Sequence, residues 1–467
     1  MDKVCTNYTA VFTGDRADSE ALLKPDITLF LKNDPTGLRG EPDAVTSFLH
    51  MELFIEIKHE RKHDPFCDLP GGGIKERGSQ DGDNTLGQCL LYAANQLAYQ
   101  HRLFSFSLVV CGNFARFIRW DREGVVVSKR IDCLQNHGLV IEFLQRFNQL
   151  TAEQRGFDPT AVLAAPEEVK LFESAVAEVN IEFLKQSVGA PDKFPRFRLE
   201  VCRSSKGVSQ YVVGKALDHN LGIVGRCTRG YLALDLSTKK CVFLKDMWRP
   251  DVTGVEPEHV WYQKLNKAEV PHLVKLKHAS DVVPFTPPVH YHGRVALEPT
   301  TTTSQKGAQR GLTGRLACLF DSEPLQGHVH FRLVQEELCQ SLSEFTSSKH
   351  LVSVVLDSLE GQIQPESHTN CRSDGGLDYA ACLSAFLNAD LFHRDASIGN
   401  VMIGPDSKGR LNDWDLCRGV DVDKSLEGPR TVRYVSYVTA LAFTPIYREP
   451  GSLCLLGYSQ SLGRGTP

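Results

Sequence analysis

The sequence predicts an α+β protein in which an α/β N-terminal domain precedes a second, mixed domain. The chain has 467 residues, more than the ~250–300 at which a single hydrophobic core stops growing. Strand-like apolar segments alternate with a segment of helical spacing over residues 1–150. A break bracketed by prolines, "GAPDKFPRF", then marks a boundary near residue 193.

The N-terminal domain is expected to hold strands on either side of a long helix. The stretches "DITLF" and "ELFIEIK" read as strands, and "TLGQCLLYAANQLAYQHRL" repeats apolar residues at helical spacing. After it, "FSFSLVVCG" is an expected strand, and "ARFIRWDREGVVVSKRID" is an expected hairpin that turns at Glu123 and Gly124. Residues 151–193 are expected to form a helical linker.

Composition excludes several classes of protein. A hydrophobic content of 42%, a charged content of 23% and a formal net charge of −5 are ordinary for a soluble globular protein. Nucleic-acid and membrane-surface binding are therefore not expected. The start carries no secretory signal, and the longest apolar runs fall short of the ~18–20 residues of a membrane helix. The 14 Cys form no CxxC pair, which favours reduced thiols and an intracellular protein, cytoplasmic or nuclear.

The clearest chemistry lies in "ADLFHRDASIGNVMIGPDSKGRLNDWDLCRG". Phosphoryl transfer needs one carboxylate to accept a hydroxyl proton, and oxygen ligands to hold Mg²⁺ on the phosphates. Asp395 and Asn400 lie between the apolar "LF" and "VMI", and Asp413 follows a short expected strand. This order can bring all three oxygens to one cavity.

The pattern resembles the protein-kinase catalytic loop and its metal-binding DFG motif. The resemblance implies that Asp395 is the catalytic base and that Asn400 and Asp413 hold Mg²⁺. Arg394 would then bind a phosphorylated activation loop, with Thr431 as a candidate phosphorylation site. The alternative role of Arg394 is a structural hydrogen bond within its loop.

Segments upstream occur in the order that this resemblance requires. "CVFLKDMWRP" resembles the strand whose Lys binds the nucleotide phosphates, which makes Lys245 the candidate. Glu258, in "EHVWYQKL", is the expected partner of Lys245, with Glu256 and Glu269 as alternatives.

A glycine-rich loop is expected ahead of Lys245. In "LGIVGRCTRGYLALDL", Gly225 and Gly230 stand where backbone would approach phosphate, so both are candidate cofactor-binding residues. Cys227 occupies the middle glycine position of the usual pattern, and its Cβ is expected to weaken ATP binding.

Longer stretches resemble one narrower family, the fungal-type protein kinases. They are "FIEIKHERKHDPF", "RFIRWDREG", "LQRFNQLTAEQRGFDPT", "GRCTRGYLALDLSTKKCVFLKDMWRP", "LFHRDASIGNVMI" and "LNDWDL". The resemblance spans roughly residues 50–431 and implies a two-lobed kinase fold that uses ATP and Mg²⁺ to phosphorylate protein Ser or Thr. The sequence does not identify the protein substrate.

The resemblance also implies how the second domain is divided. Its parts are an upper lobe at 194–335 with a polar insert at 298–315, a partial lower lobe at 336–431, and an atypical tail at 432–467.

Three features favour a rival function, a catalytically impaired pseudokinase or scaffold. They are Cys227, Asp415 in place of the glycine of the metal-binding motif, and the missing C-terminal helices. Ser397 stands where Ser/Thr kinases usually carry a Lys, a feature that the fungal-type family shares and that leaves the phosphate acceptor open. After "GPRT" the chain departs from the family's remaining helices, for which we hypothesise a retained intron, a shifted frame or a truncated paralogue. The truncated lower lobe is expected to expose apolar surface.

The N-terminal domain carries a second candidate chemistry. Asp26 after Pro25, followed by Glu56 and Lys58 in "EIK", resembles the PD-(D/E)xK signature of Mg²⁺-dependent nucleases. Gln88, four residues before a Tyr, resembles the helix motif of some members. The alternatives are a nuclease-like scaffold without activity and a regulatory α/β domain.

Overall fold

The computed structural model describes residues 4–39, 45–70, 74–202, 207–217, 221–252, 255–283, 285–286, 295–296, 327–359 and 381–419. The insert at 298–315, the segment 420–431 with Thr431, and the tail at 432–467 lie outside these residues. The described chain is a mixed α/β protein with two large sheets. No helix in it has the length and apolar character needed to cross a bilayer.

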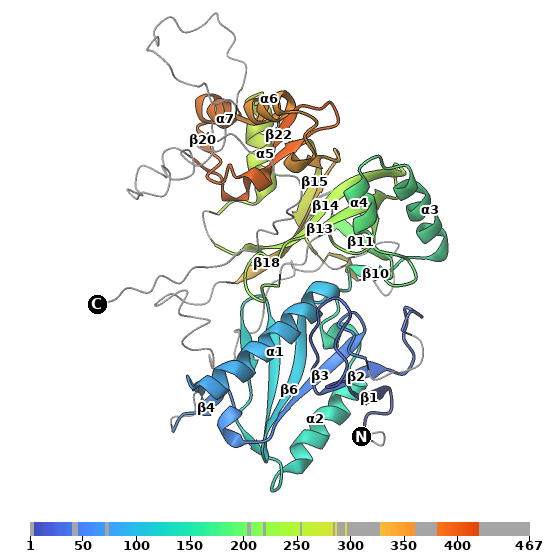
Figure 1. Ribbon diagram of the computed structural model, residues 1–467, viewed down its shortest axis with the longest axis vertical. Helices are drawn as coiled ribbons and strands as arrows, with labels where there is room; N and C mark the ends of the chain where they lie inside the picture. Colours follow the sequence, from blue (N-terminus) through green and yellow to red (C-terminus); the bar gives the residue numbers. More distant parts are fainter. Residues whose placement is uncertain are drawn as a thin grey trace, which may run out of the picture.

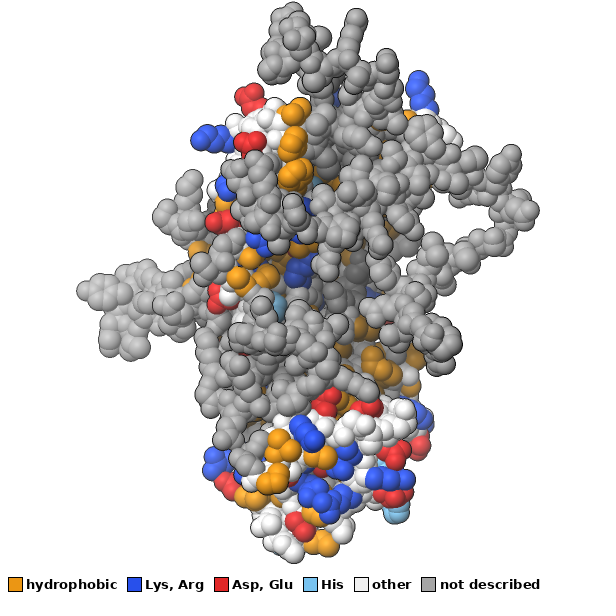
Figure 2. Space-filling model, turned by 90° about the vertical axis from the view of Figure 1, so that its left-hand side faces the viewer, with side chains coloured by type: hydrophobic (Ala, Val, Ile, Leu, Met, Phe, Trp, Pro, Cys, Tyr) orange, Lys and Arg blue, Asp and Glu red, His pale blue; other side chains and the backbone are white. Residues whose placement is uncertain are grey.

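Three parts follow one another along the long axis of the molecule (Figure 1). They are an N-terminal unit (residues 4–157), a central unit (158–335) and a C-terminal cluster (336–419). On the face of the N-terminal unit seen in Figure 2, Lys and Arg side chains lie among Asp and Glu side chains.

A mixed sheet forms the middle of the N-terminal unit, with the strand order β1-β2-β3-β6-β7-β8 and β9 paired to β7. Its first strands are antiparallel, whereas β3 and β6 are parallel and are joined through helix α1. The strands are β1 (Tyr8–Phe12), β2 (Ile27–Leu31), β3 (Met51–Lys58), β6 (Phe104–Cys111), β7 (Phe114–Asp121), β8 (Val125–Val127) and β9 (Ile131–Asp132).

Helices cover both faces of this sheet. Alternation along β3 sends Phe54 into the core that α1 shares, and Leu53 into the core that α2 shares. The Ser79 hydroxyl caps α1 by accepting a hydrogen bond from Gly82 N at 3.2 Å. The remaining elements are α1 (Gln80–Tyr99), α2 (His137–Gln149), the hairpin of β4 (Phe66–Asp68) and β5 (Ile74–Glu76), and the 3₁₀ helices η1 (Arg61–His63) and η2 (Glu153–Arg155).

The central unit is a second sheet with the strand order β10-β11-β12-β13-β14-β18-β15. All of its neighbouring strands are antiparallel. The elements are β10 (Ala161–Leu163), α3 (Pro166–Ala177), α4 (Glu182–Ser187), β11 (Phe197–Cys202), β12 (Val208–Val213), β13 (Arg229–Asp235), β14 (Lys240–Pro250), α5 (Glu258–Lys267), β15 (Leu276–Asp281), the pair β16 (Phe285–Thr286) and β17 (Val295–Ala296), and β18 (His328–Gln335).

The segment 151–193, expected as a helical linker, does form the two helices α3 and α4, but much of it packs into the central unit. β10 pairs with β11, and α3 and α4 bury Phe172 and Leu184 against the second sheet. The Glu168 carboxylate accepts a hydrogen bond from Ala165 N at 2.8 Å, which fixes the start of α3. Because β10 is only 3 residues long, it shows no periodicity that would reveal it in the sequence.

The C-terminal cluster packs around α5. Tyr262 of α5 and Trp414 are both fully buried in one apolar core with Leu411. Helix α5 therefore joins the central sheet to the cluster. The elements of the cluster are β19 (Gln340–Ser341), η5 (Leu342–Glu344), α6 (Ser348–Leu359), α7 (Ala381–Ala389), β20 (Leu391–Phe392), η6 (Ile398–Asn400), β21 (Val401–Ile403), β22 (Gly409–Leu411), η7 (Trp414–Leu416) and β23 (Arg418–Gly419).

Candidate functional site

The candidate site centres on the buried ammonium group of Lys245, in the middle of β14. Lys245 is 6% exposed, and its Nζ lies 2.9 Å from Asp413 Oδ1 and 3.5 Å from Glu258 Oε1. Burial alone would lower the pKa of Lys245, but the two carboxylates outweigh burial and raise it. The lysine is therefore held as a cation between an acid of α5 and an acid of the C-terminal cluster.

Glu258, the first residue of α5, is one of the two carboxylates that contact Lys245. Its Oε1 also accepts a hydrogen bond from Trp414 N at 3.3 Å, which links α5 to the segment that carries Asp413. Burial raises the pKa of Glu258, and Lys245 opposes that shift. Among the described contacts of Lys245, neither of the alternative partners, Glu256 and Glu269, takes part.

The loop after β20 places Asp395 beside Asn400. Asn400 Nδ2 donates hydrogen bonds to the Asp395 backbone oxygen at 2.8 Å and to Asp395 Oδ2 at 3.1 Å. His393 Nδ1 accepts from Asp395 N at 3.2 Å, so the Nε2–H of a neutral ring donates to Asn412 O at 2.9 Å. Burial lowers the pKa of His393, which keeps this tautomer neutral.

Asp413 follows β22 in a left-handed conformation, with φ 65° and ψ 62°. This conformation turns its carboxylate toward Lys245, while the next residue, Trp414, is buried in the core. Burial would raise the pKa of Asp413, but the charge and hydrogen bond of Lys245 outweigh it and hold that pKa below its usual value. Asp413 is therefore an ionised carboxylate at neutral pH.

Asn400 and Asp413 offer a donor set that fits Mg²⁺. Because Asn400 uses its amide nitrogen to bind Asp395, its amide oxygen is left to accept from another group or a metal. Asp413 uses Oδ1 for Lys245, and Oδ2 accepts no hydrogen bond from the described residues. The backbones meet as well, because Asn412 N donates to Asn400 O at 2.9 Å. Carboxylate and amide oxygens are ligands that Mg²⁺ prefers.

Two glycines of the predicted phosphate loop have different structural roles. The backbone of Gly225 has a φ of +104°, a conformation that residues other than glycine rarely adopt. Gly230 pairs with Lys245 across β13 and β14, and a Cβ there would lie 2.8 Å from the Phe243 ring. Cys227 is buried, and its thiol donates to the loop's own Gly222 O at 3.1 Å. The loop is thus compact and internally bonded.

An ion pair connects this loop to the segment after β22: Arg226 binds the carboxylate of Asp415. Beside this pair lies a cavity of about 350 Å³ between α5 and the loop after β20, lined in part by Arg394, Arg418 and Trp261. Arg394 has φ 68°, and no hydrogen bond from its guanidinium to another described residue is present. The cavity therefore offers arginine side chains together with the carboxylates of Glu256, Glu258 and Asp415.

Sequence reasoning missed a buried polar cluster behind Asp413. Asn412 Oδ1 accepts hydrogen bonds from Gln335 Nε2 at 2.6 Å and from Tyr262 Oη at 3.2 Å. These contacts join β18, α5 and the segment after β22, and so they fix the position of Asp413. The only local signal was an Asn immediately before Asp413, the predicted metal ligand.

The structure also brings together three of the four nuclease-like residues. Asp26 Oδ2 accepts from Ile57 N at 2.7 Å, and Lys58 Nζ binds Glu56 Oε1 at 2.6 Å. Burial raises the pKa of Glu56, opposed by Lys58. Gln88 lies exposed on α1 and forms no described hydrogen bond. Within the described residues, no three His, Cys, Asp or Glu side chains gather into a metal-binding group.

A model of one protein family matches the chain over residues 53–364, and its description is "Fungal protein kinase". The matched residues run from β3 through α6, so they include Lys245 and Glu258. Asp395, Asn400 and Asp413 follow the matched region. No curated protein matches the chain.

Proposed function

The chain belongs to the fungal protein kinase family, and on this premise we propose that it transfers the γ-phosphate of ATP to a Ser or Thr hydroxyl of a protein. The central unit and the C-terminal cluster are then the two lobes of the kinase. The observation that carries the proposal is the buried Lys245 between Glu258 and Asp413. A buried ammonium is costly unless it is paired, and here its acidic partners come from two separate parts of the molecule.

Each residue of the site has a role in this reaction. Lys245 binds the α- and β-phosphates, while Glu258 keeps its ammonium in place. For this, Lys245 exchanges its contact with Asp413 for phosphate oxygens, and the Asp413 carboxylate becomes available for Mg²⁺ together with Asn400. The chemistry that Mg²⁺ supplies when bound is neutralisation of the phosphate charge.

Asp395 is the proposed base. Its carboxylate accepts the proton of the substrate hydroxyl as that oxygen bonds to the γ-phosphorus. The bond between the γ-phosphorus and its bridging oxygen breaks at the same time, and ADP leaves with that electron pair. The hydrogen bonds from Asn400 hold the Asp395 carboxylate in position.

The test separates nucleotide binding from transfer. The full chain is titrated with Mg·ADP by calorimetry, and phosphate transfer from labelled ATP to a mixture of casein and histone is measured, together with autophosphorylation. Asp395→Asn is expected to keep the wild-type Kd and lose transfer, whereas Lys245→Met loses both. At a hundredfold excess of ligand over Kd, the nucleotide should stabilise the wild-type fold by ~2.7 kcal/mol.

A folded wild-type chain that binds no nucleotide would overturn the proposal and favour the scaffold function. Binding without any transfer would favour the pseudokinase, in line with Cys227 and Asp415.

One observation favours a second candidate function for the N-terminal unit, Mg²⁺-dependent nuclease activity. Asp26 immediately precedes β2, and Glu56 and Lys58 lie in the neighbouring strand β3. The Asp26 carboxylate accepts a hydrogen bond from the backbone of Ile57, and Glu56 and Lys58, the residues on either side of Ile57, form an ion pair. The test is Mg²⁺-dependent nicking of a supercoiled plasmid. Nicking that is lost in Glu56→Ala and retained in Asp395→Ala would support this function, and no nicking by the wild type would exclude it.

A further inference from the structure

The glycine-rich loop, residues 221–230, is anchored in the N-terminal unit. Ile223 of this loop is 7% exposed, and its side chain belongs to the same hydrophobic core as Trp120 and Leu97 of the N-terminal unit. A loop that only awaited phosphate would have no reason to bury an apolar side chain in another unit of the protein.

Arg122, in the turn between β7 and β8, binds the backbone of the glycine-rich loop. Its guanidinium donates to Gly222 O at 3.1 Å and to Ile223 O at 3.5 Å, and it also donates to Leu97 O at 3.1 Å. In return, Gly225 N donates to Arg122 O at 3.3 Å. Arg122 is 2% exposed, so water competes little for these contacts.

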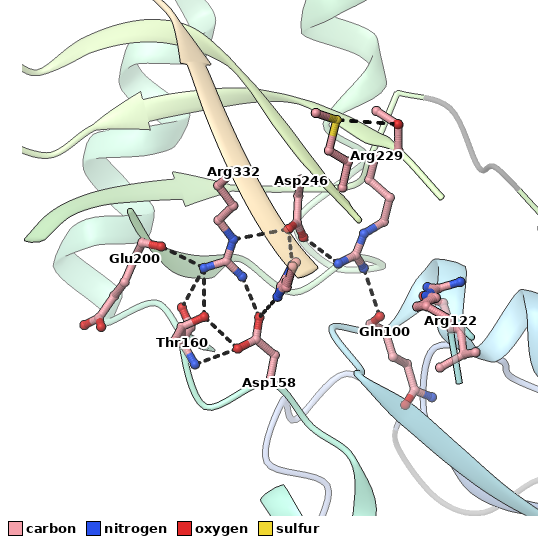
Figure 3. A network of polar contacts seen from close by, with 12 residues as sticks. Gln100, Arg122, Asp158, Thr160, Glu200, Arg229, Asp246 and Arg332 are labelled. Atoms are coloured by element: carbon pink, nitrogen blue, oxygen red, sulfur yellow. Dashed lines mark hydrogen bonds and ion pairs between the residues drawn. The ribbon is translucent and has the colours of Figure 1, made fainter. Parts of the chain in front are cut away.

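Arg229, near the end of the loop, and Lys215, which precedes it, also contact the N-terminal unit. Arg229 donates to Gln100 O at 2.9 Å and to Asp246 at 2.6 Å, so it bridges the N-terminal unit and β14. Figure 3 shows Arg229 reaching from Asp246 toward Gln100. On the other side, Lys215 Nζ binds Glu20 Oε2 at 2.6 Å.

We propose that the N-terminal unit is a working part of the nucleotide site, because it holds the glycine-rich loop in position for phosphate, with Arg122 as the positioning residue. This inference rests on the proposed kinase function of the Lys245 site. It assigns a role to the N-terminal unit that is independent of any chemistry at Glu56.

The physical reason is the entropy of the loop. A free loop must be ordered when it closes on phosphate, and the cost of fixing each residue is subtracted from the binding free energy. Anchors that fix the loop beforehand remove much of this cost. The ion pair between Arg226 and Asp415 keeps the anchored loop next to the metal-binding segment.

The experiment compares Arg122→Gln and Arg122→Lys with two matched controls in the full chain. Arg116→Gln removes a buried arginine of β7, whose hydrogen bonds all stay within the N-terminal unit. Arg146→Gln removes an exposed arginine of α2. Each variant is titrated with Mg·ADP, assayed for kcat and for the KM of ATP, and analysed by hydrogen exchange without nucleotide.

We expect Arg122→Gln to raise the Kd of Mg·ADP and the KM of ATP about tenfold, the size of effect for losing charge-assisted hydrogen bonds that are not replaced. The kcat at saturating ATP should stay within about twofold, because the reacting groups are untouched. Amides of the loop should exchange faster, and Arg122→Lys should recover part of the affinity. The Arg146→Gln control should behave as the wild type.

An unchanged or lower Kd in a folded Arg122→Gln variant would overturn the inference. So would an equal loss in Arg116→Gln, because the effect would then be general destabilisation. If Arg122→Gln does not fold, Lys215→Ala serves instead, since that side chain is partly exposed, and an unchanged Kd there would count against the inference. A wild type that binds no nucleotide refutes the kinase function, whereas the exchange rates still show whether the anchor exists.

Discussion

Replacing Asp246 by Asn should destabilise the central unit strongly. Asp246 is 1% exposed, and its carboxylate contacts Arg229 at 2.6 Å, His330 at 2.5 Å and Arg332 at 3.2 Å (Figure 3). The substitution keeps the side-chain volume but removes the negative charge that Asp246 places beside Arg229 and Arg332. Asp158, which lies 2.5 Å from Arg332, then remains as the neighbouring carboxylate. Breaking a buried ion pair costs about 3–5 kcal/mol. Since Asn still accepts hydrogen bonds, we expect about 3 kcal/mol.

Urea unfolding followed by tryptophan fluorescence measures this loss. Trp248 stacks on His330 with ring centroids 4.7 Å apart, so its emission reports on the network. The matched control is Asp281→Asn on the same sheet, which breaks the more exposed pair with Arg249 and should cost less than about 1 kcal/mol. A loss for Asp246→Asn no larger than for the control would refute the reasoning.

Three further predictions follow from named contacts. Glu258→Gln should weaken Mg·ADP binding by about tenfold, because Lys245 loses an ionised partner, whereas Glu256→Gln should leave the Kd unchanged in calorimetry. Gly156→Ala should lower the free energy of urea unfolding by about 3 kcal/mol or more, because the φ of Gly156 is +100° and the new Cβ would lie 1.9 Å from a backbone oxygen. The control Gly87→Ala in α1 places its Cβ within 4 Å of no atom and should not destabilise the protein. Burial raises the pKa of Asp246, but its cationic neighbours outweigh burial and hold it well below 3.8. Its contribution is therefore complete above the unfolded value of about 3.9 and is lost at lower pH, so acid should lower the urea midpoint of the wild type more steeply than that of Asp246→Asn.

Local sequence patterns were sufficient to predict the site residues that lie in a single loop or in a recognisable motif. Lys245 in an apolar run indicated a buried, partnered lysine, and the structure places Glu258 and Asp413 on it. The spacing of Asp395 and Asn400 indicated that a single short loop would bring them together, and they are hydrogen-bonded. Asp395 and Asn400 lie in one loop, whereas the partners of Lys245 come from α5 and from the segment after β22 and were indicated by recognisable motifs.

The sequence could not reveal how the two large units contact each other. Asp246 and Arg332 are charged residues within strands, which normally indicates a solvent-facing surface. Both are nevertheless buried, in a network whose Arg229 also donates to Gln100 of the N-terminal unit. The contact of Arg122 with Gly222 joins residues 100 positions apart, and no periodicity encodes such a pairing. The short strand β10 was missed for a related reason, since its place in the sheet is decided by β11.

The adjacency of Lys245 and Asp246 ties the two surfaces of the central sheet together. Successive side chains of a strand point to opposite faces, so Lys245 is directed to Glu258 and Asp413, and Asp246 to the network of Arg229 and Arg332. Packed interiors transmit strain because they contain few voids. A shift of the N-terminal unit that moves Arg229 must therefore move β14, and with it the ammonium group of Lys245. A change at that interface would consequently displace the Lys245 ammonium group and, under the proposed function, alter phosphate binding even if it touched no residue of the site.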